Sequence, residues 1–82
     1  MKVDIKYIFE CNGGFRYIRD TFSEIKQVVD ENYEALKNMA KNGDSVNMYM
    51  DYNNPYSPTA SISACIDGTW KFYSLYTKVT EL

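Results

Sequence analysis

A single long segment of helical periodicity lies in this chain between shorter segments that alternate with period two. Apolar residues recur at spacings of three and four from Phe22 onward, which predicts an amphipathic helix of about five turns over Phe22–Lys41. Thr21 precedes Glu24 by three residues, as in a capping box, and Asn42-Gly43 is expected to end the helix. One helix has one apolar stripe, so it can cover only one face of a sheet.

Five segments carry the alternation of apolar and polar residues that is typical of half-buried strands. They cover residues 2–10, 15–18, 46–52, 59–66 and 70–79. Turns are expected at Asn12-Gly13 and Asp67-Gly68, and Thr80–Leu82 is expected to fray. The fold class predicted is α+β, with one amphipathic helix packed on a four- to five-stranded antiparallel sheet in the order β-β-α-β-β-β.

The chain contains no histidine among its 82 residues, which removes the commonest general base and the commonest neutral metal ligand. No cysteine spacing suits zinc, and Asp51–Asn54 lacks the glycine and the distal glutamate of a calcium loop. No glycine loop fits a phosphate. We therefore expect a non-catalytic protein with no cofactor and no metal, folded as a single domain over residues 1–82.

Net charge bears on the kind of partner, and the start of the chain and its cysteines bear on location. The formal net charge is −2, too near neutral for a typical phosphate-binding protein. The start of the chain lacks the apolar core of a signal peptide, and no stretch is apolar enough to cross a membrane. A cytoplasmic location is expected, with Cys11 and Cys65 as free thiols. Cys11 is expected to be accessible beside its glycine turn.

Three surfaces are candidates for binding. The first is the sheet face away from the helix, with Tyr49 and one face of the last strand. That face is either Trp70, Phe72 and Tyr76 or Lys71, Tyr73, Leu75 and Thr77. The second is the Asn53–Pro58 loop with its flanking tyrosines, and the third is the acidic outer face of the helix. The candidate partner-binding residues are Asp30, Glu31, Glu34, Tyr49, Tyr52, Asn53, Asn54, Tyr56 and Tyr73.

Small chains rich in tyrosine and asparagine and without histidine are typical of phages and mobile elements, although no motif here identifies a family. The first hypothesis is therefore an inhibitor or modulator that binds a host protein complex, with an anti-CRISPR-like inhibitor of a nuclease complex as the concrete candidate. Its acidic patch would compete for a basic surface that normally holds nucleic acid. The alternative is single-stranded nucleic-acid binding, with Tyr49, Trp70 and Tyr73 stacking on bases. This hypothesis requires cations around the rings, from Arg16, Arg19, Lys71 and Lys78. Exposed edge strands and the open sheet face are also compatible with a homodimer.

Overall fold

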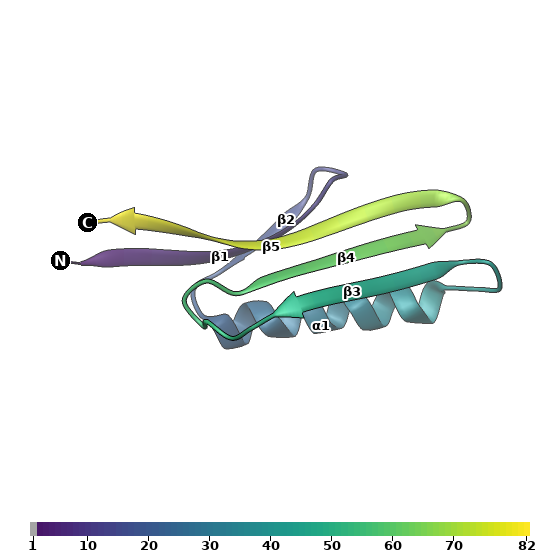
Figure 1. The fold of residues 1–82 in the computed structure, drawn as a ribbon. Coiled ribbons are helices and arrows are strands. Elements are labelled where there is room, and N and C mark those ends of the chain that lie inside the picture. Colours follow the sequence, from purple (N-terminus) through teal and green to yellow (C-terminus); the bar gives the residue numbers. More distant parts are fainter. Residues whose placement is uncertain (1) are drawn as a thin grey trace.

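The computed structural model describes residues 2–82, and it confirms the α+β prediction. Five strands form one antiparallel sheet in the order β2-β1-β5-β4-β3, and a single helix lies against one face of it (Figure 1). The elements are β1 (Val3–Cys11), β2 (Arg16–Arg19), α1 (Phe22–Met39), β3 (Ser45–Asp51), β4 (Thr59–Ile66) and β5 (Thr69–Glu81).

The first and last strands pair with each other at the centre of the sheet. The β1–β5 ladder runs from Cys11 opposite Tyr73 to Val3 opposite Glu81. The backbone N–H of Leu82 also donates to the carbonyl oxygen of Lys2, over 2.9 Å. The prediction that Thr80–Leu82 frays is therefore wrong, because the start of β1 supplies a partner strand.

The turn residues behave partly as the sequence predicts. Asp67 and Gly68 both have positive φ, 51° and 77°, which is the two-residue hairpin turn expected between β4 and β5. Between β1 and β2 the positive φ, 105°, belongs to Gly14. That turn spans four residues, and the N–H of Cys11 donates to the Phe15 carbonyl oxygen over 3.0 Å to close it.

Helix α1 begins as predicted and ends two residues early. The N–H of Glu24 donates to the Thr21 hydroxyl over 3.2 Å, which confirms the cap. At the other end Ala40 is already extended, with ψ 137°. The Asp44 carboxylate accepts the N–H of Lys41 at 2.9 Å and that of Asp67 at 3.1 Å. These two hydrogen bonds lower the pKa of Asp44. The one from Lys41, with the return bond from the Asp44 N–H to the Lys41 carbonyl oxygen, closes residues 41–44 into a separate turn.

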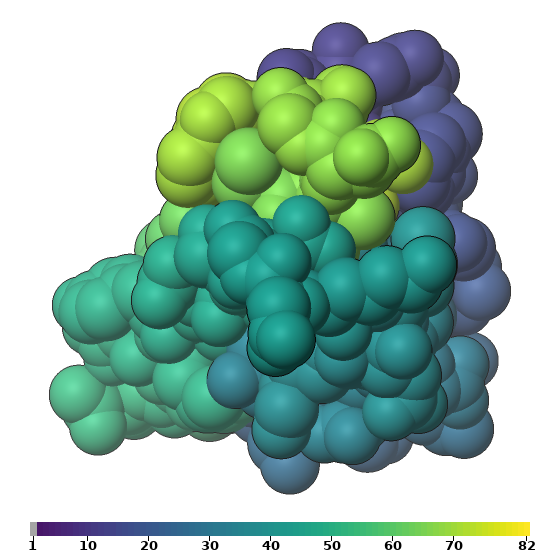
Figure 2. Space-filling view, turned by 90° about the vertical axis from the view of Figure 1, so that its right-hand side faces the viewer, coloured from purple at the N-terminus to yellow at the C-terminus, as the bar shows by residue number. Residues whose placement is uncertain are grey.

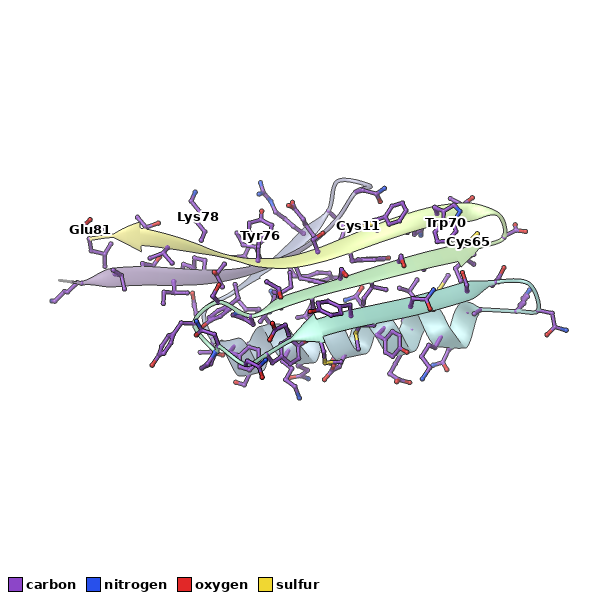
Figure 3. The ribbon with its side chains drawn as sticks, in the orientation of Figure 1. Cys11, Cys65, Trp70, Tyr76, Lys78 and Glu81 are labelled. Carbon is purple, nitrogen blue, oxygen red and sulfur yellow. The ribbon has the colours of Figure 1, made fainter. Side chains whose placement is uncertain are left out.

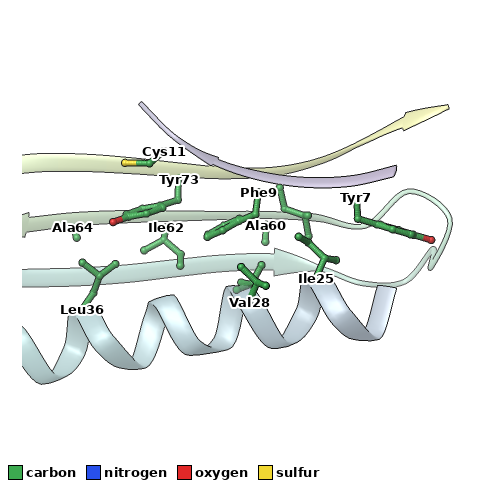
Figure 4. Close-up of a cluster of buried hydrophobic side chains, with 12 residues drawn as sticks. Tyr7, Phe9, Cys11, Ile25, Val28, Leu36, Ala60, Ile62, Ala64 and Tyr73 are labelled. Atoms are coloured by element: carbon green, nitrogen blue, oxygen red, sulfur yellow. The ribbon is translucent and has the colours of Figure 1, made fainter. Parts of the chain in front are cut away.

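Apart from Ile8, the buried apolar side chains of the described residues gather between α1 and the sheet face it covers (Figure 4). Phe9 is fully buried there, and Ile25 and Val29 of the helix are equally enclosed. Ala60 and Ala64 of β4 keep the sheet surface low beneath the helix. Viewed from the end of the molecule, α1 and the turn after it lie below the β4–β5 hairpin (Figure 2). The core is therefore one-sided, and the far face of the sheet is open.

Candidate functional site: the open sheet face

The pairing register decides which face of β5 is open. Leu75 lies opposite both Phe9 and Ala60, which face the helix, so odd-numbered residues of β5 share that side. Trp70, Phe72 and Tyr76 therefore point away from α1, as Figure 3 shows for Trp70 and Tyr76. We call these three residues the aromatic strip.

Tyr73 belongs to the core, so the prediction that it contacts a partner or stacks on a base is wrong. It is only 5% exposed, and its ring stacks on Phe9 with centroids 5.6 Å apart. Burial raises the pKa of Tyr73, and the neighbouring Cys11 and Tyr17 add to that effect. The alternation along β5 left two faces possible, and the register selects the other one.

The aromatic strip is well exposed. The rings of Trp70 and Phe72 lie parallel and offset, with centroids 5.8 Å apart and planes 5° apart, and the two residues are 52% and 49% exposed. Tyr76 follows on the same side of β5, over one third exposed. Tyr49 of β3 also lies on this face, because it pairs with Ser61 of β4. The sequence predicted Tyr49 correctly as an open-face residue.

Small side chains flank the aromatic strip. Ser63 lies directly opposite Phe72, and Cys65 lies opposite Trp70. Small neighbours leave the edges of the large rings uncovered, so the face is a flat platform with raised aromatic groups. Cys65 is half-buried on this face, whereas Cys11 is buried on the helix side, contrary to the expectation that it is accessible. The sheet separates the two thiols, and both are free.

A shallow groove of about 550 Å³ continues the aromatic strip between β2, β1 and β5. Ile8, Ile18 and Tyr76 form its apolar part, because Ile8 pairs with both of the others. Its remaining lining residues are Lys6, Arg16, Thr77 and Lys78. Sequence reasoning missed this groove, although Ile8 and Ile18 stand where a solvated face would carry polar residues. This departure from the alternation of apolar and polar residues is the signal in the sequence that indicates the groove.

The cations around the groove are partly neutralised. Lys6 forms ion pairs with Asp20 and, at 3.7 Å, with Asp4, and the hydrogen bond with Asp20 raises the pKa of Lys6. Arg16 and Lys78 form no ion pair within residues 2–82. Two other cations that the nucleic-acid hypothesis would use, Arg19 and Lys71, share the helix side of the sheet, opposite Tyr7 and Ala64.

The Asn53–Pro58 loop is tied to the body of the protein. The Tyr7 hydroxyl donates to the Pro55 carbonyl oxygen over 3.0 Å, and Pro58 is fully buried. The side-chain oxygen of Asn54 accepts the N–H of Tyr56 at 3.0 Å, so it is engaged within the turn. The N–H of Asn53 donates to Asp51 over 3.1 Å. Tyr56 is 69% exposed and is the one aromatic side chain this loop offers to a partner.

Tyr52 does not flank the loop as an exposed residue, which corrects the prediction for it. Its ring packs edge-on against Phe22 of α1, with centroids 5.1 Å apart. Its hydroxyl is buried and has no hydrogen-bond partner among the described residues. Burial, with a smaller contribution from Asp30, raises the pKa of Tyr52.

Two conservative substitutions should therefore change stability in opposite directions. Tyr52→Phe removes an unsatisfied buried hydroxyl and is expected to raise the free energy of unfolding by about 1 kcal/mol. Tyr7→Phe breaks the bond to Pro55 and is expected to lower it by about 1 kcal/mol. Urea denaturation followed by far-UV circular dichroism measures both. A change of the same sign in the free energy of unfolding of both variants would contradict this account of the two hydroxyls.

The acidic residues of α1 lie on the other side of the sheet from the aromatic strip, and they are matched locally. Asp30 lies 3.9 Å from Lys26, and Glu34 lies 3.8 Å from Lys37. Glu31 accepts a hydrogen bond from Gln27 at 2.9 Å. The candidate residues are thus dispersed over the helix, the open face, the loop and the protein interior, and the structure does not bring them into one site.

Metal-binding clusters and membrane-spanning helices are both absent from the described part of the chain. Among residues 2–82 there is no cluster of three or more histidine, cysteine, aspartate or glutamate side chains that could hold a metal ion. No helix in the same range has the length and apolarity needed to cross a membrane. Comparisons with protein-family models, with curated proteins and with solved structures find no match to this chain.

Proposed function

We propose that this protein is a non-catalytic module that binds another protein through its open sheet face. The observation that carries the proposal is the aromatic strip, where three large aromatic residues stand on one strand and remain 37–52% exposed. Tryptophan and tyrosine are enriched among the residues that dominate binding energy at protein interfaces. Exposed apolar patches rimmed by polar groups are typical of interaction sites.

The charge distribution favours a protein partner over a nucleic acid. Binding to a phosphate backbone depends on several cations that are free to replace counterions. Lys6 is engaged by two carboxylates, and the chain as a whole carries a net charge of −2. A protein partner needs no such excess of positive charge, because apolar burial around the aromatic strip supplies the attraction.

Within this proposal, a phage or mobile-element inhibitor that binds a host nuclease complex in the cytoplasm is our concrete candidate. The outer face of α1 supports it, because Glu31 lacks an ion pair within the described chain and its neighbours are only loosely paired, at 3.8 Å and 3.9 Å. Such a surface would complement a basic groove on the partner. The aromatic strip would then supply affinity, and the helix would contribute to specificity.

Single-stranded nucleic-acid binding is the second candidate, and one observation favours it. The stacked Trp70 and Phe72 offer flat rings on the same face as Arg16 and Lys78. Base–aromatic stacking contributes about 1–3 kcal/mol per base. This mode would make binding fall steeply as salt is added.

A capture experiment separates these candidates. Tagged wild-type protein, the variant Trp70→Ala/Phe72→Ala, and the helix variant Asp30→Lys/Glu31→Lys/Glu34→Lys are each exposed to lysate of the native host, with and without nuclease. A stoichiometric protein that survives nuclease and is lost only with the strip variant supports the proposal. The affinity of that partner should fall by at least about 30-fold in the strip variant, as expected for the loss of hot-spot residues.

Each other outcome has a defined meaning. Loss only with the helix variant would place recognition on α1 and refute the open face as the binding site. Recovery of nucleic acid alone, abolished by nuclease, would refute the protein-binding proposal in favour of the second candidate. Because Trp70 is the sole tryptophan, titration of a dT oligonucleotide followed by its fluorescence, at two salt concentrations, then tests stacking directly.

A further inference from the structure

The outer edge of β5 is unpaired over its last third. Strand β4 pairs with β5 only as far as Ala60 opposite Leu75, and the loop before β4 then leaves the sheet. From Thr77 to Glu81, β5 has a partner only in β1 among the described residues. This part of β5 and residues 3–6 of β1 form a two-stranded ribbon that extends beyond the other strands (Figure 1). We call this ribbon the arm.

The hydrogen-bond pattern identifies which backbone groups of the arm are free. Leu82 donates to Lys2 and Asn12 donates to Phe72, so even-numbered residues of β5 exchange hydrogen bonds with β1. Since successive residues of an antiparallel strand direct these groups to opposite edges, the N–H and C=O groups of Thr77, Val79 and Glu81 point outward. A row of unpaired donors and acceptors is a template for another strand.

The arm also carries uncovered apolar side chains. Val79 lies opposite Ile5 on the side of the sheet that α1 covers, but it is 58% exposed because the helix does not reach the arm. Val3 follows on the same face and is nearly half exposed. An isolated two-stranded ribbon is only marginally stable in water, so these groups are suited to burial against a further strand.

We propose that a second copy of this chain pairs with the arm, β5 against β5, about a twofold axis at Val79. In this register Val79 lies opposite its own copy, and Thr77 lies opposite Glu81 of the second copy. The outward N–H and C=O groups of all three residues then find partners in both copies. On the helix side, Ile5 and Val79 of each copy form one continuous apolar row across the twofold axis.

Charge is compatible with this register. Lys78 lies opposite Thr80 of the second copy, so no like charges face each other directly across the new ladder. A shift by two residues in one direction requires Leu75, which already pairs with β4, and a shift in the other direction sets Thr77 beyond the described residues of the second copy. The register centred on Val79 is thus the one that satisfies the free edge completely.

The other long edges are less suitable. On β1, pairing Val3 with Ile5 of a second copy would set Asp4 directly against Asp4. Centring on Ile5 instead would require the outer edge of Tyr7, which β2 already occupies. On β3, Val46 and Met48 already pack against the core, so pairing there would leave the exposed apolar face of the arm uncovered.

Charged variants at Val79 test the proposal. The wild-type protein is expected to sediment as a dimer, whereas Val79→Lys and Val79→Glu each place like charges at the axis. Each substitution should weaken dimerisation by about tenfold or more. An equimolar mixture of the two variants should restore the dimer, because the introduced lysine of one chain then faces the introduced glutamate of the other. Far-UV circular dichroism confirms that each variant is folded, since Val79 is largely exposed in the monomer.

Met50→Lys on the β3 edge is the matched control, because Met50 is also an exposed apolar residue on the helix side of an edge strand. It is expected to leave the dimer intact. A wild-type protein that sediments as a monomer at millimolar concentration overturns the proposal. A dimer that Met50→Lys dissociates and Val79→Lys does not would place the interface on β3 and equally overturn it. Neither result bears on the aromatic strip, which lies on the opposite face.

Discussion

Replacing Phe9 with alanine is expected to lower the free energy of unfolding by about 3–5 kcal/mol. Phe9 is 0% exposed, stacks on Tyr73, and stands on β1, which pairs with β2 on one side and β5 on the other. The lost contacts therefore affect three strands together. Small domains have a total stability of about 5–15 kcal/mol, so this one truncation consumes much of it.

Urea denaturation followed by far-UV circular dichroism measures this effect. Ile18→Ala is the control, because Ile18 is a half-exposed apolar residue on the opposite face, and it is expected to cost about 1 kcal/mol or less. If Ile18→Ala destabilised the protein more than Phe9→Ala, the dominant core would have to lie on the face assigned here as open.

Truncating Tyr73 and truncating Phe72 should have very different consequences, although the two aromatic residues are adjacent. Tyr73→Ala empties a site under α1 and is expected to cost about 3–5 kcal/mol. Phe72→Ala removes a ring that is half exposed above Ser63 and is expected to cost about 1 kcal/mol or less. Thermal and urea unfolding of the two variants side by side measure the contrast.

The same pair separates stability from binding. Phe72→Ala should remain folded and lose affinity for the partner, whereas the loss of function in Tyr73→Ala should follow its loss of fold. A Tyr73→Ala protein as stable as Phe72→Ala would mean that β5 presents its other face to the helix. The aromatic strip would then be part of the core, and the proposed binding surface would be wrong.

The sequence predicted the architecture because local patterns and the fold agree in most elements. Alternation placed Ile62 and Ala64 toward the helix, and Thr21 marked the helix start correctly. The last strand was ambiguous because both of its faces carry bulky residues. Its orientation follows from the hairpin register, because the two-residue turn at Asp67-Gly68 sets Ile66 opposite Thr69 and thus Ala60 opposite Leu75; alternation within the last strand alone does not reveal this register.

The other missed features depend on specific contacts that periodicity and charge do not report. At the early end of α1, the Asp44 carboxylate accepts the N–H of Lys41, which a longer helix would direct to Lys37, and the same carboxylate holds Asp67, 23 residues further along the chain. Tyr52 stands next to a loop in the sequence, but its contact with Phe22 draws the side chain inward. The partner-binding candidates on α1 were identified from charge alone, and charge does not report the ion pairs that Lys26 and Lys37 form with them.

The central position of the β1–β5 ladder has a consequence for how the chain acquires its fold. Loop closure is entropically costly, and contacts between distant residues slow folding. The β3–β4 and β4–β5 hairpins need only short loops, but β1 has no partner on its β5 side until residues 69–81 have been synthesised. During synthesis, β1 leaves the ribosome well before β5, so Phe9 stays without Tyr73 and Leu75 beside it until β5 emerges.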